Sequence, residues 1–266
     1  MSDKVTVSVL KKKKQSGEKI VALTAYDASA AVRVERAGID LVLVGDSVGM
    51  TLLGYETTVP VTLEDILHHT KAVARGLKRS LLVADMPFLS FGVDPVETVR
   101  NAGRLIKEGG ACAVKLEGGK ELAEEVVALT RAGIPVLGHI GLHPQHILVM
   151  GEYSVKGKDQ IEAKQLREDA MCLEEAGAFG LVLECVPSGL ARMITEDLHV
   201  PTIGIGAGLH CDGQILVFQD LLGLTEGRKP KFVKTYAQLG KEVDIALLQY
   251  TREVREGHFP NGEHSY

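Results

Sequence analysis

Eight short apolar segments, separated by stretches with helical periodicity, place the strongest constraint on how this chain of 266 residues can fold. Near-continuous apolar runs are typical of parallel strands that are buried on both faces of a sheet. Eight strands that alternate with helices in about 250 residues predict a closed (β/α)₈ barrel of the TIM-barrel class, with an open doubly wound sheet as the alternative. The predicted strands span residues 20–26, 41–46, 81–85, 111–117, 136–141, 180–185, 202–206 and 214–219.

The segments between these runs carry signals for the start of helices. Asp94, Pro95 and Glu97 stand in register as an N-cap, a first helical residue and a capping-box acid. Thr62 opens another helix in a similar way. We also expect a helical extension before the first strand and a long helix near the end of the chain. One apolar stripe runs along that last helix, formed by Leu239, Val243, Leu247, Tyr250 and Val254.

The spacing of the segments departs from a regular barrel in two places. Only a short loop separates the seventh and eighth strands, so the helix between them is expected to be missing or reduced to a turn. Its glycine-rich run 204–208 lacks the G-x-G-x-x-G spacing of a dinucleotide site and favours a tight turn. The stretch 141–162 is long and glycine-rich, which is typical of a loop over a site. No linker-like composition divides the chain, so residues 1–266 are expected to form a single domain.

Composition argues against several classes of protein. The net charge of −5 provides no basic field, so we expect no nucleic-acid partner. The four lysines at 11–14 are interpreted as the solvated face of a helix. The first residues do not resemble a signal peptide, and no apolar stretch approaches the roughly 20 residues of a membrane span, so no membrane partner is expected. Four scattered cysteines without a C-x-x-C pair agree with a cytoplasmic protein.

Polar residues stand at the carboxyl ends of five predicted strands, where catalytic groups gather in a parallel barrel. Side chains alternate along a strand, so Asp46 is expected on the face of Val42 and Val44, and Asp85 on the face of Val83. If these faces line the barrel interior, six side chains converge on one mouth. They are Asp46, Asp85, Lys115, Glu117, His139 and Glu184.

Each of these residues also has a purely structural interpretation when it is taken alone. An acid at a strand end is commonly a helix N-cap, Lys115 with Glu117 could form an internal ion pair, and His139 could be a core histidine. Four acids and one lysine at equivalent positions favour a functional site. Because clustered carboxylates repel one another, some must be protonated or share a cation. Oxygen ligands favour Mg²⁺ or another hard divalent ion.

Zinc is the alternative metal, because His139, His143 and His146 are spaced by four and three residues and would share a face on a helix. Gly141 and Pro144 disfavour a helix there, so the acids are expected to hold the metal. Composition and pattern alone therefore predict a Mg²⁺-dependent barrel enzyme that acts on a small oxyacid.

Several long segments extend this interpretation, among them "TAYDASAAVRVERAGIDLVLVGDSVGM", "LLVADMPF", "VKLEGG", "GHIGL", "LVLECVP", "IGIGAG", "CDGQILV" and "FPNGEHSY". Together they resemble the ketopantoate hydroxymethyltransferase family, over almost the whole chain. The resemblance implies a TIM-barrel enzyme of pantothenate and coenzyme A biosynthesis. It would transfer a hydroxymethyl group from 5,10-methylenetetrahydrofolate to 3-methyl-2-oxobutanoate and so form 2-dehydropantoate.

The matching motifs imply a metal site and a base. Asp46, Asp85 and Glu117 would hold Mg²⁺ directly or through water, and the ion would stabilise an enolate of the keto acid. Glu184 would be the base that removes the proton. The family also typically assembles as a decamer, so a homo-oligomer is expected.

The remaining implied contacts belong to the keto acid. Its binding residues would be Asp46, Ser47, Asp85, Lys115 and His139. The chain departs from the family pattern at His143, where threonine is usual, and at Glu152, where a second glycine is usual. Both lie in the stretch 141–162, so they put details of that loop and of pterin contacts in doubt.

Two other functions remain open on sequence grounds. A metal-dependent C–C lyase or mutase of the phosphoenolpyruvate mutase/isocitrate lyase type would use a similar acid cluster, although it usually needs a further nucleophile or acid loop. A non-catalytic ligand-binding barrel is the second alternative, but it would have no use for a base such as Glu184.

Overall fold

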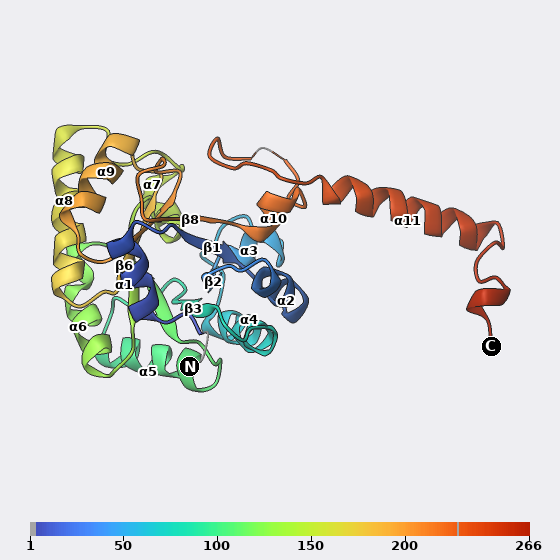
Figure 1. The fold of residues 1–266 in the computed structure, drawn as a ribbon, viewed down its shortest axis with the longest axis horizontal. Helices are drawn as coiled ribbons and strands as arrows, with labels where there is room; N and C mark the ends of the chain where they lie inside the picture. Colours follow the sequence, from blue (N-terminus) through green and yellow to red (C-terminus); the bar gives the residue numbers. More distant parts are fainter. Residues whose placement is uncertain (1–3, 228) are drawn as a thin grey trace. The chain divides into compact units, whose positions relative to one another are not determined.

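The computed structural model describes residues 4–227 and 229–266, and its strands form a closed barrel (Figure 1). Each strand pairs in parallel with the next one along the chain, and β1 pairs with β8 to close the sheet. The strands are β1 (Ile20–Thr24), β2 (Leu41–Val44), β3 (Leu81–Asp85), β4 (Ala113–Glu117), β5 (Val136–Gly141), β6 (Gly180–Glu184), β7 (Thr202–Ile205) and β8 (Gly213–Leu216). The predicted (β/α)₈ barrel is confirmed, and the open-sheet alternative is wrong.

Helices surround the strands, as Figure 1 shows for α4, α5, α6, α8 and α9. Thr62 forms a capping box with Asp65 at the start of α4, and Asp94 caps α5, whose first residue is Pro95. The helices up to β8 are α1 (Val7–Ser16), α2 (Ala28–Arg36), α3 (Val48–Thr51), α4 (Leu63–Gly76), α5 (Pro95–Lys107), α6 (Ala123–Arg131), α7 (Ile147–Met150), α8 (Gln160–Glu175) and α9 (Ser188–Asp197). None of the described helices is both long and apolar enough to cross a membrane.

The two irregular connections have the expected character. Within the described residues no helix lies between β7 and β8, whose strands pair directly. The connection from β5 to α8 contains only two short helical turns, η2 (Pro144–His146) and α7. A third such turn, η1 (Lys120–Leu122), follows β4.

The N-terminal helix α1 closes the barrel at the amino ends of the strands. Leu10 packs into the inner apolar cluster of the barrel. Lys13 forms an ion pair with Asp40 just before β2, and Lys14 forms one with Asp212 just before β8. The interpretation of the lysine run as a solvated face is therefore wrong for these two residues, because the buried Asp40 and the partly buried Asp212 at the strand starts need partners.

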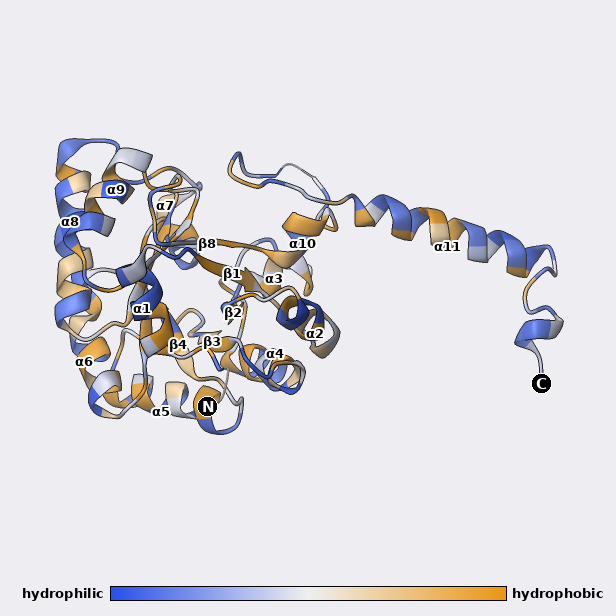
Figure 2. Cartoon of the chain, in the orientation of Figure 1, coloured by the Kyte–Doolittle hydropathy of each residue, from blue (hydrophilic) through white to orange (hydrophobic). Residues whose placement is uncertain are grey.

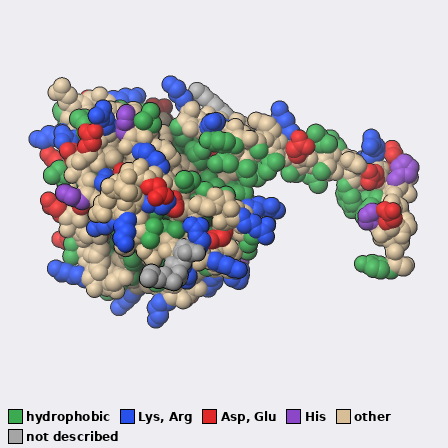
Figure 3. All heavy atoms as spheres, viewed as in Figure 1, with side chains coloured by type: hydrophobic (Ala, Val, Ile, Leu, Met, Phe, Trp, Pro, Cys, Tyr) green, Lys and Arg blue, Asp and Glu red, His purple; other side chains and the backbone are tan. Residues whose placement is uncertain are grey.

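Contacts divide the chain into one unit that ends at Val217 and a second unit from Phe218 onward. The second unit contains α10 (Phe218–Leu222), α11 (Leu239–Arg255, red in Figure 1) and η3 (Gly262–His264). The predicted long helix is thus confirmed, but α11 buries none of its residues. Its apolar residues interrupt the hydrophilic ones along the helix in Figure 2 and stand on the surface in Figure 3. We call Leu239, Val243, Leu247, Tyr250 and Val254 the α11 stripe; each is at least 39% exposed.

Candidate active site

The inner face of the barrel changes from apolar to charged toward the carboxyl ends of the strands. In β4, Ala113 belongs to the inner apolar cluster, and Lys115 and Glu117 continue the same alternation. Strand pairing sets Asp85 of β3 beside Lys115, and Glu117 beside His139 of β5. The strand register therefore brings these four polar residues together, as the sequence predicted.

Asp46 reaches the cluster by a different route. The inner residues of β2 are Leu41 and Leu43, so the prediction that the face of Val42 and Val44 lines the interior is wrong. Asp46 lies beyond the last residue of β2, in the turn that leads to α3, and is not bound by strand alternation. The turn directs it inward, where its backbone N–H donates to Asp85 Oδ2 at 3.0 Å.

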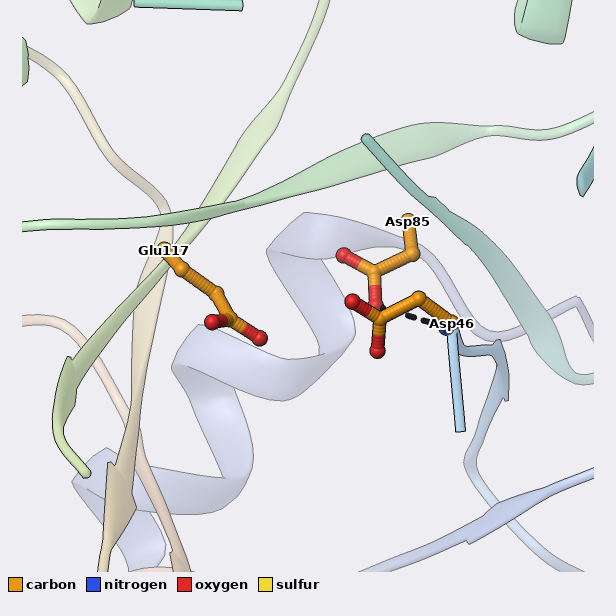
Figure 4. Close-up of side chains that lie close together, drawn as sticks. All are labelled: Asp46, Asp85 and Glu117. Carbon is orange, nitrogen blue, oxygen red and sulfur yellow. Dashed lines mark hydrogen bonds between the residues drawn. The ribbon is translucent and has the colours of Figure 1, made fainter. Parts of the chain in front are cut away.

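Three carboxylates form the centre of the cluster (Figure 4). Asp46, Asp85 and Glu117 are all buried and at most 4% exposed. Each offers one oxygen, and these oxygens lie within 4.8 Å of one another. In Figure 4 the side chains extend from three neighbouring segments toward a common space.

Lys115 is the cation built into this cluster. Its Nζ donates to Glu117 Oε1 at 3.2 Å and lies 3.0 Å from Asp85 Oδ1. The second contact is an ion pair without directed hydrogen-bond geometry, because Asp85 Oδ1 receives no hydrogen bond from the described residues. One ammonium therefore faces three buried acids.

The protonation of the cluster follows from this imbalance. Burial, and then repulsion by Asp85 and Glu117, raises the pKa of Asp46 well above its ordinary value. Burial also raises the pKa of Asp85, although Lys115 opposes the shift. For Glu117 burial is outweighed by Lys115 and His139, which lower its pKa. Burial of Lys115 is outweighed by the three acids, which raise its pKa. Lys115 and Glu117 are therefore a charged pair, while Asp46 and Asp85 hold too much negative charge for the partners present.

His139 connects this cluster to Glu184, which ends β6. Its Nδ1 lies 3.2 Å from Lys115 Nζ and 3.4 Å from Glu117 Oε1. Its Nε2 lies 3.2 Å from Glu184 Oε2. Burial and Lys115 lower the pKa of His139, but Glu117 and Glu184 outweigh them and leave that pKa above its ordinary value.

Glu184 stands apart from the three central acids. It follows the inner residue Val182 on β6, and 16% of its side chain is exposed. Backbone geometry is tight around it, because Gly141 has a φ of 101° and a Cβ there would collide with the carbonyl oxygen of Glu184. Cys185 has a φ of 50°, a left-handed conformation that is uncommon for a residue other than glycine. The polypeptide is thus held in a specific conformation at this residue.

Ser47 lies at the edge of the cluster. It follows Asp46 and is half-buried, and its Oγ is 2.8 Å from the hydroxyl of Tyr26. Burial raises the pKa of Tyr26 to about 12, so the phenol stays protonated and can fix the Ser47 hydroxyl. His69 Nδ1 donates to the backbone oxygen of Tyr26 at 2.7 Å.

Two further residues near the cluster had no signal in the sequence beyond their place in the long stretch 141–162. Gln145 in η2 is buried, and its side chain donates to Asp46 Oδ2 at 2.9 Å. Tyr153 is 44% exposed. Its pKa is raised by burial and by the charges of Asp46, Glu184 and Glu117, which places it near the same mouth.

The three histidines of the zinc alternative form a stack and do not form a ligand set. The ring of His143 makes edge contacts with His139 and His146, and its Nε2 donates to the carbonyl oxygen of His139. Burial, together with the charge of His139, lowers the pKa of His143 to about 4, so it is neutral. Among the described residues, the group with metal-ligand spacing consists of Asp46, Asp85 and Glu117.

A divalent cation fits this group. The ligands are oxygens, as Mg²⁺ prefers, and Asp85 Oδ1 is a buried acceptor that receives no hydrogen bond from the described residues. The surplus negative charge on Asp46 and Asp85 calls for a cation in addition to Lys115. Both observations point to the same position between the three carboxylates.

Comparison with known proteins gives a consistent result over the whole chain. A model of the ketopantoate hydroxymethyltransferase family matches residues 4–262. The 3-methyl-2-oxobutanoate hydroxymethyltransferase of Carboxydothermus hydrogenoformans is 55% identical, over 99% of this chain and 96% of the relative. The enzyme of the same name from Syntrophus aciditrophicus is 53% identical, over 99% and 97% of the two chains.

Solved structures show the same barrel at low sequence identity. A phosphonopyruvate hydrolase in complex with oxalate and Mg²⁺ has a TM-score of 0.63 and 13% identity, over 99% of this chain and 93% of that one. A 2,3-dimethylmalate lyase of the phosphoenolpyruvate mutase/isocitrate lyase superfamily has a TM-score of 0.59 and 16% identity, over 100% and 92%. These likenesses establish the fold alone.

Proposed function

Because the chain belongs to the ketopantoate hydroxymethyltransferase family, we propose that the acid cluster at the mouth of its barrel is the site of hydroxymethyl transfer to 3-methyl-2-oxobutanoate. The donor in this proposal is 5,10-methylenetetrahydrofolate, and the product enters pantothenate biosynthesis. The observation that carries the proposal is the division of labour among the acids. Three of them have the spacing of metal ligands, and Glu184 lies outside this group, next to His139.

Asp46, Asp85 and Glu117 would hold Mg²⁺ or another divalent ion. Bound there, the ion would offset the negative charge that develops on the keto acid as its enolate forms. The phosphonopyruvate hydrolase with the same fold is described with oxalate and Mg²⁺, a 2-oxo acid analogue and a metal, which supports this assignment.

Glu184 removes the proton from C3 of the keto acid. It is partly open to the mouth and is not one of the three metal ligands, so its carboxylate is free to accept a proton. His139 Nε2 lies 3.2 Å from Glu184 Oε2 in an ion contact and makes no directed hydrogen bond with the described residues. Lys115 and His139 offset the charge of the substrate, and Ser47, fixed by Tyr26, donates a hydrogen bond to it.

The enolate carbon then forms a bond to the methylene carbon of the donor. The donor contributes a methylene group only: both bonds from this carbon to the folate nitrogens break, one water molecule supplies the hydroxyl group, and the proton from C3 and one from water end on the two nitrogens of the departing tetrahydrofolate. Holding the enolate and the donor at the same mouth supplies much of the remaining acceleration.

Exchange of deuterium into 3-methyl-2-oxobutanoate tests the base and the substrate together. The keto acid is incubated in D₂O with the protein and Mg²⁺, with and without the folate donor, and analysed by mass spectrometry; EDTA is the control. We expect metal-dependent deuterium at C3 and a hydroxymethyl adduct when the donor is present. Adduct without exchange would mean that enolisation waits for the donor. Neither product from folded protein would refute the substrate assignment.

The two alternative functions, a lyase or mutase and a ligand-binding barrel, predict different outcomes when the protein is incubated with small acids. A lyase or mutase would cleave or rearrange 2-hydroxy or phosphono acids, and its support is limited to a shared fold at 13–16% identity. A ligand-binding barrel would take up the keto acid in a calorimeter without turning it over.

The assembly and the compartment are part of the proposal. We infer a homo-oligomer, because the α11 stripe leaves five apolar side chains in water that a second copy would cover. The four cysteines are free thiols, which suits a reducing cytoplasm.

A further inference from the structure

Gln145 contacts Asp46 and Glu117, two of the three central acids, although it lies in a different segment of the chain from either. It is 3% exposed and belongs to η2, in the connection from β5 to α8. One hydrogen of its amide group points to Asp46 Oδ2 at 2.9 Å and the other to the carbonyl oxygen of Met86 at 3.0 Å. The backbone N–H of Gln145 donates to Glu117 Oε2 at 3.2 Å.

These bonds fix the acids in a specific way. Asp46 is carried by a turn, so strand register does not set the direction of its carboxylate. The amide of Gln145 sets it, while the Met86 carbonyl holds that amide in place. Glu117 is held on one oxygen by Lys115 and on the other by the Gln145 backbone. Each carboxylate keeps lone pairs for a cation.

We propose that Gln145 is a positioning residue for the metal. It aims Asp46 and Glu117 at a common point and thereby couples the β5–α8 connection to metal binding. The inference rests on the metal site of the proposed function. By thermodynamic reciprocity, a metal that prefers the aimed carboxylates also stabilises the connection that aims them.

The connection also contacts His139 through His143 and Glu184 through the backbone of Leu142. Leu148 and Val149 in α7, directly after Gln145, are 74% and 91% exposed. Gln145, however, is the residue next to this exposed turn whose hydrogen bonds reach the proposed metal ligands themselves, Asp46 and Glu117. Metal binding should therefore change the environment of the side chains in α7.

The test compares Gln145→Met with Gln165→Met in the full chain. Methionine has a similar length and no donor. Gln165 on α8 is the matched control, because its side chain also donates to a carboxylate, Asp169, at 2.8 Å, and Asp169 is not one of the three proposed metal ligands. Binding of Mn²⁺ alone is measured by electron paramagnetic resonance. We expect Gln145→Met to raise the Kd about 10- to 100-fold, as loss of a partner of a metal ligand does, and Gln165→Met to leave it unchanged.

A fluorescence reporter tests the coupling separately. The chain has no tryptophan, so Leu148→Trp makes α7 the only source of indole emission. We expect Mn²⁺ to change this emission in the Leu148→Trp chain. Mg²⁺, which does not quench fluorescence, should do the same. Neither ion should change the emission in the double variant that also carries Gln145→Met. An unchanged Kd in Gln145→Met, or an equal loss in Gln165→Met, would refute the positioning role. An emission response that survives Gln145→Met at saturating metal would refute the coupling. Wild-type chain that binds no Mn²⁺ would refute the metal site itself and this inference with it.

Discussion

Soluble proteins usually bury apolar side chains and expose charged ones, and the barrel and the C-terminal unit depart from this pattern in different ways. The barrel buries three carboxylates and a lysine at its mouth, whereas α11 exposes an apolar stripe along its whole length. Buried charge is costly without a partner, and exposed contiguous apolar surface is costly in water. In our proposal, an ion offsets the surplus negative charge of the barrel and a second copy of the chain covers the apolar residues of α11. Buried carboxylates therefore indicate a cation as the missing partner, and an exposed apolar stripe indicates a protein surface.

The largest expected effect is a loss of turnover on substitution of Glu184, which lies at the charged mouth of the barrel but outside the group of three proposed metal ligands. Glu184→Gln removes the base and leaves the three ligands in place, so kcat should fall about 10²- to 10⁴-fold. Metal and keto-acid binding, measured by calorimetry, should remain. Glu175→Gln on α8 is the control and should keep wild-type turnover. Near-wild-type kcat in Glu184→Gln would remove this residue from the mechanism.

A smaller but clear effect is expected at α11. Leu247→Glu places a charge in the α11 stripe, and full burial of one leucine side chain contributes about 1.5–3 kcal/mol. The assembly should therefore dissociate at roughly 10- to 100-fold higher protein concentration than wild type, measured by sedimentation. Gln249→Glu, two residues along and on the opposite side of the helix, should have little effect. A wild-type chain that is monomeric at every concentration would show that no second copy covers the stripe.

The smallest expected effect is the pH dependence of stability in the charged mouth. The pKa of Asp46 is raised in the folded protein, so without metal the folded state holds its proton longer than the unfolded state. The contribution of Asp46 to stability therefore falls as the pH rises from about 4, the unfolded pKa, toward the raised value. Asparagine does not ionise, so Asp46→Asn removes this loss of stability at high pH. In EDTA its Tm should exceed that of wild type by a few degrees at pH 8 and by little at pH 4.5.

Added Mg²⁺ should reverse the order at pH 8, because wild type gains the metal and Asp46→Asn does not. Two Tm curves in EDTA that stay parallel across this pH range would contradict the raised pKa of Asp46.

The sequence predicted what depends on short-range pattern. Apolar segments and their spacing gave the barrel, and alternation along β4 placed Lys115 and Glu117 on one face. It failed where the chain leaves a regular element: alternation gave the wrong reason for Asp46, which a turn directs inward. Gln145 meets Asp46 across 99 positions, and only the tertiary structure shows such a pair. Lys13 and Lys14 likewise pair with acids at the strand starts, Asp40 and Asp212, which the local charge pattern does not show.

The carboxylates of the cluster are carried by segments that differ in rigidity. Asp85 and Glu117 end strands whose neighbours on both sides hold them in the barrel, so their separation is set by the closed sheet. Asp46 is carried by a turn and aimed by a single amide. If the three carboxylates hold a metal as proposed, ions of different radius would be accommodated by movement of Asp46, while Asp85 and Glu117 keep the separation that the sheet sets. The position of Glu184, which also ends a strand, would then not depend on which divalent ion is bound.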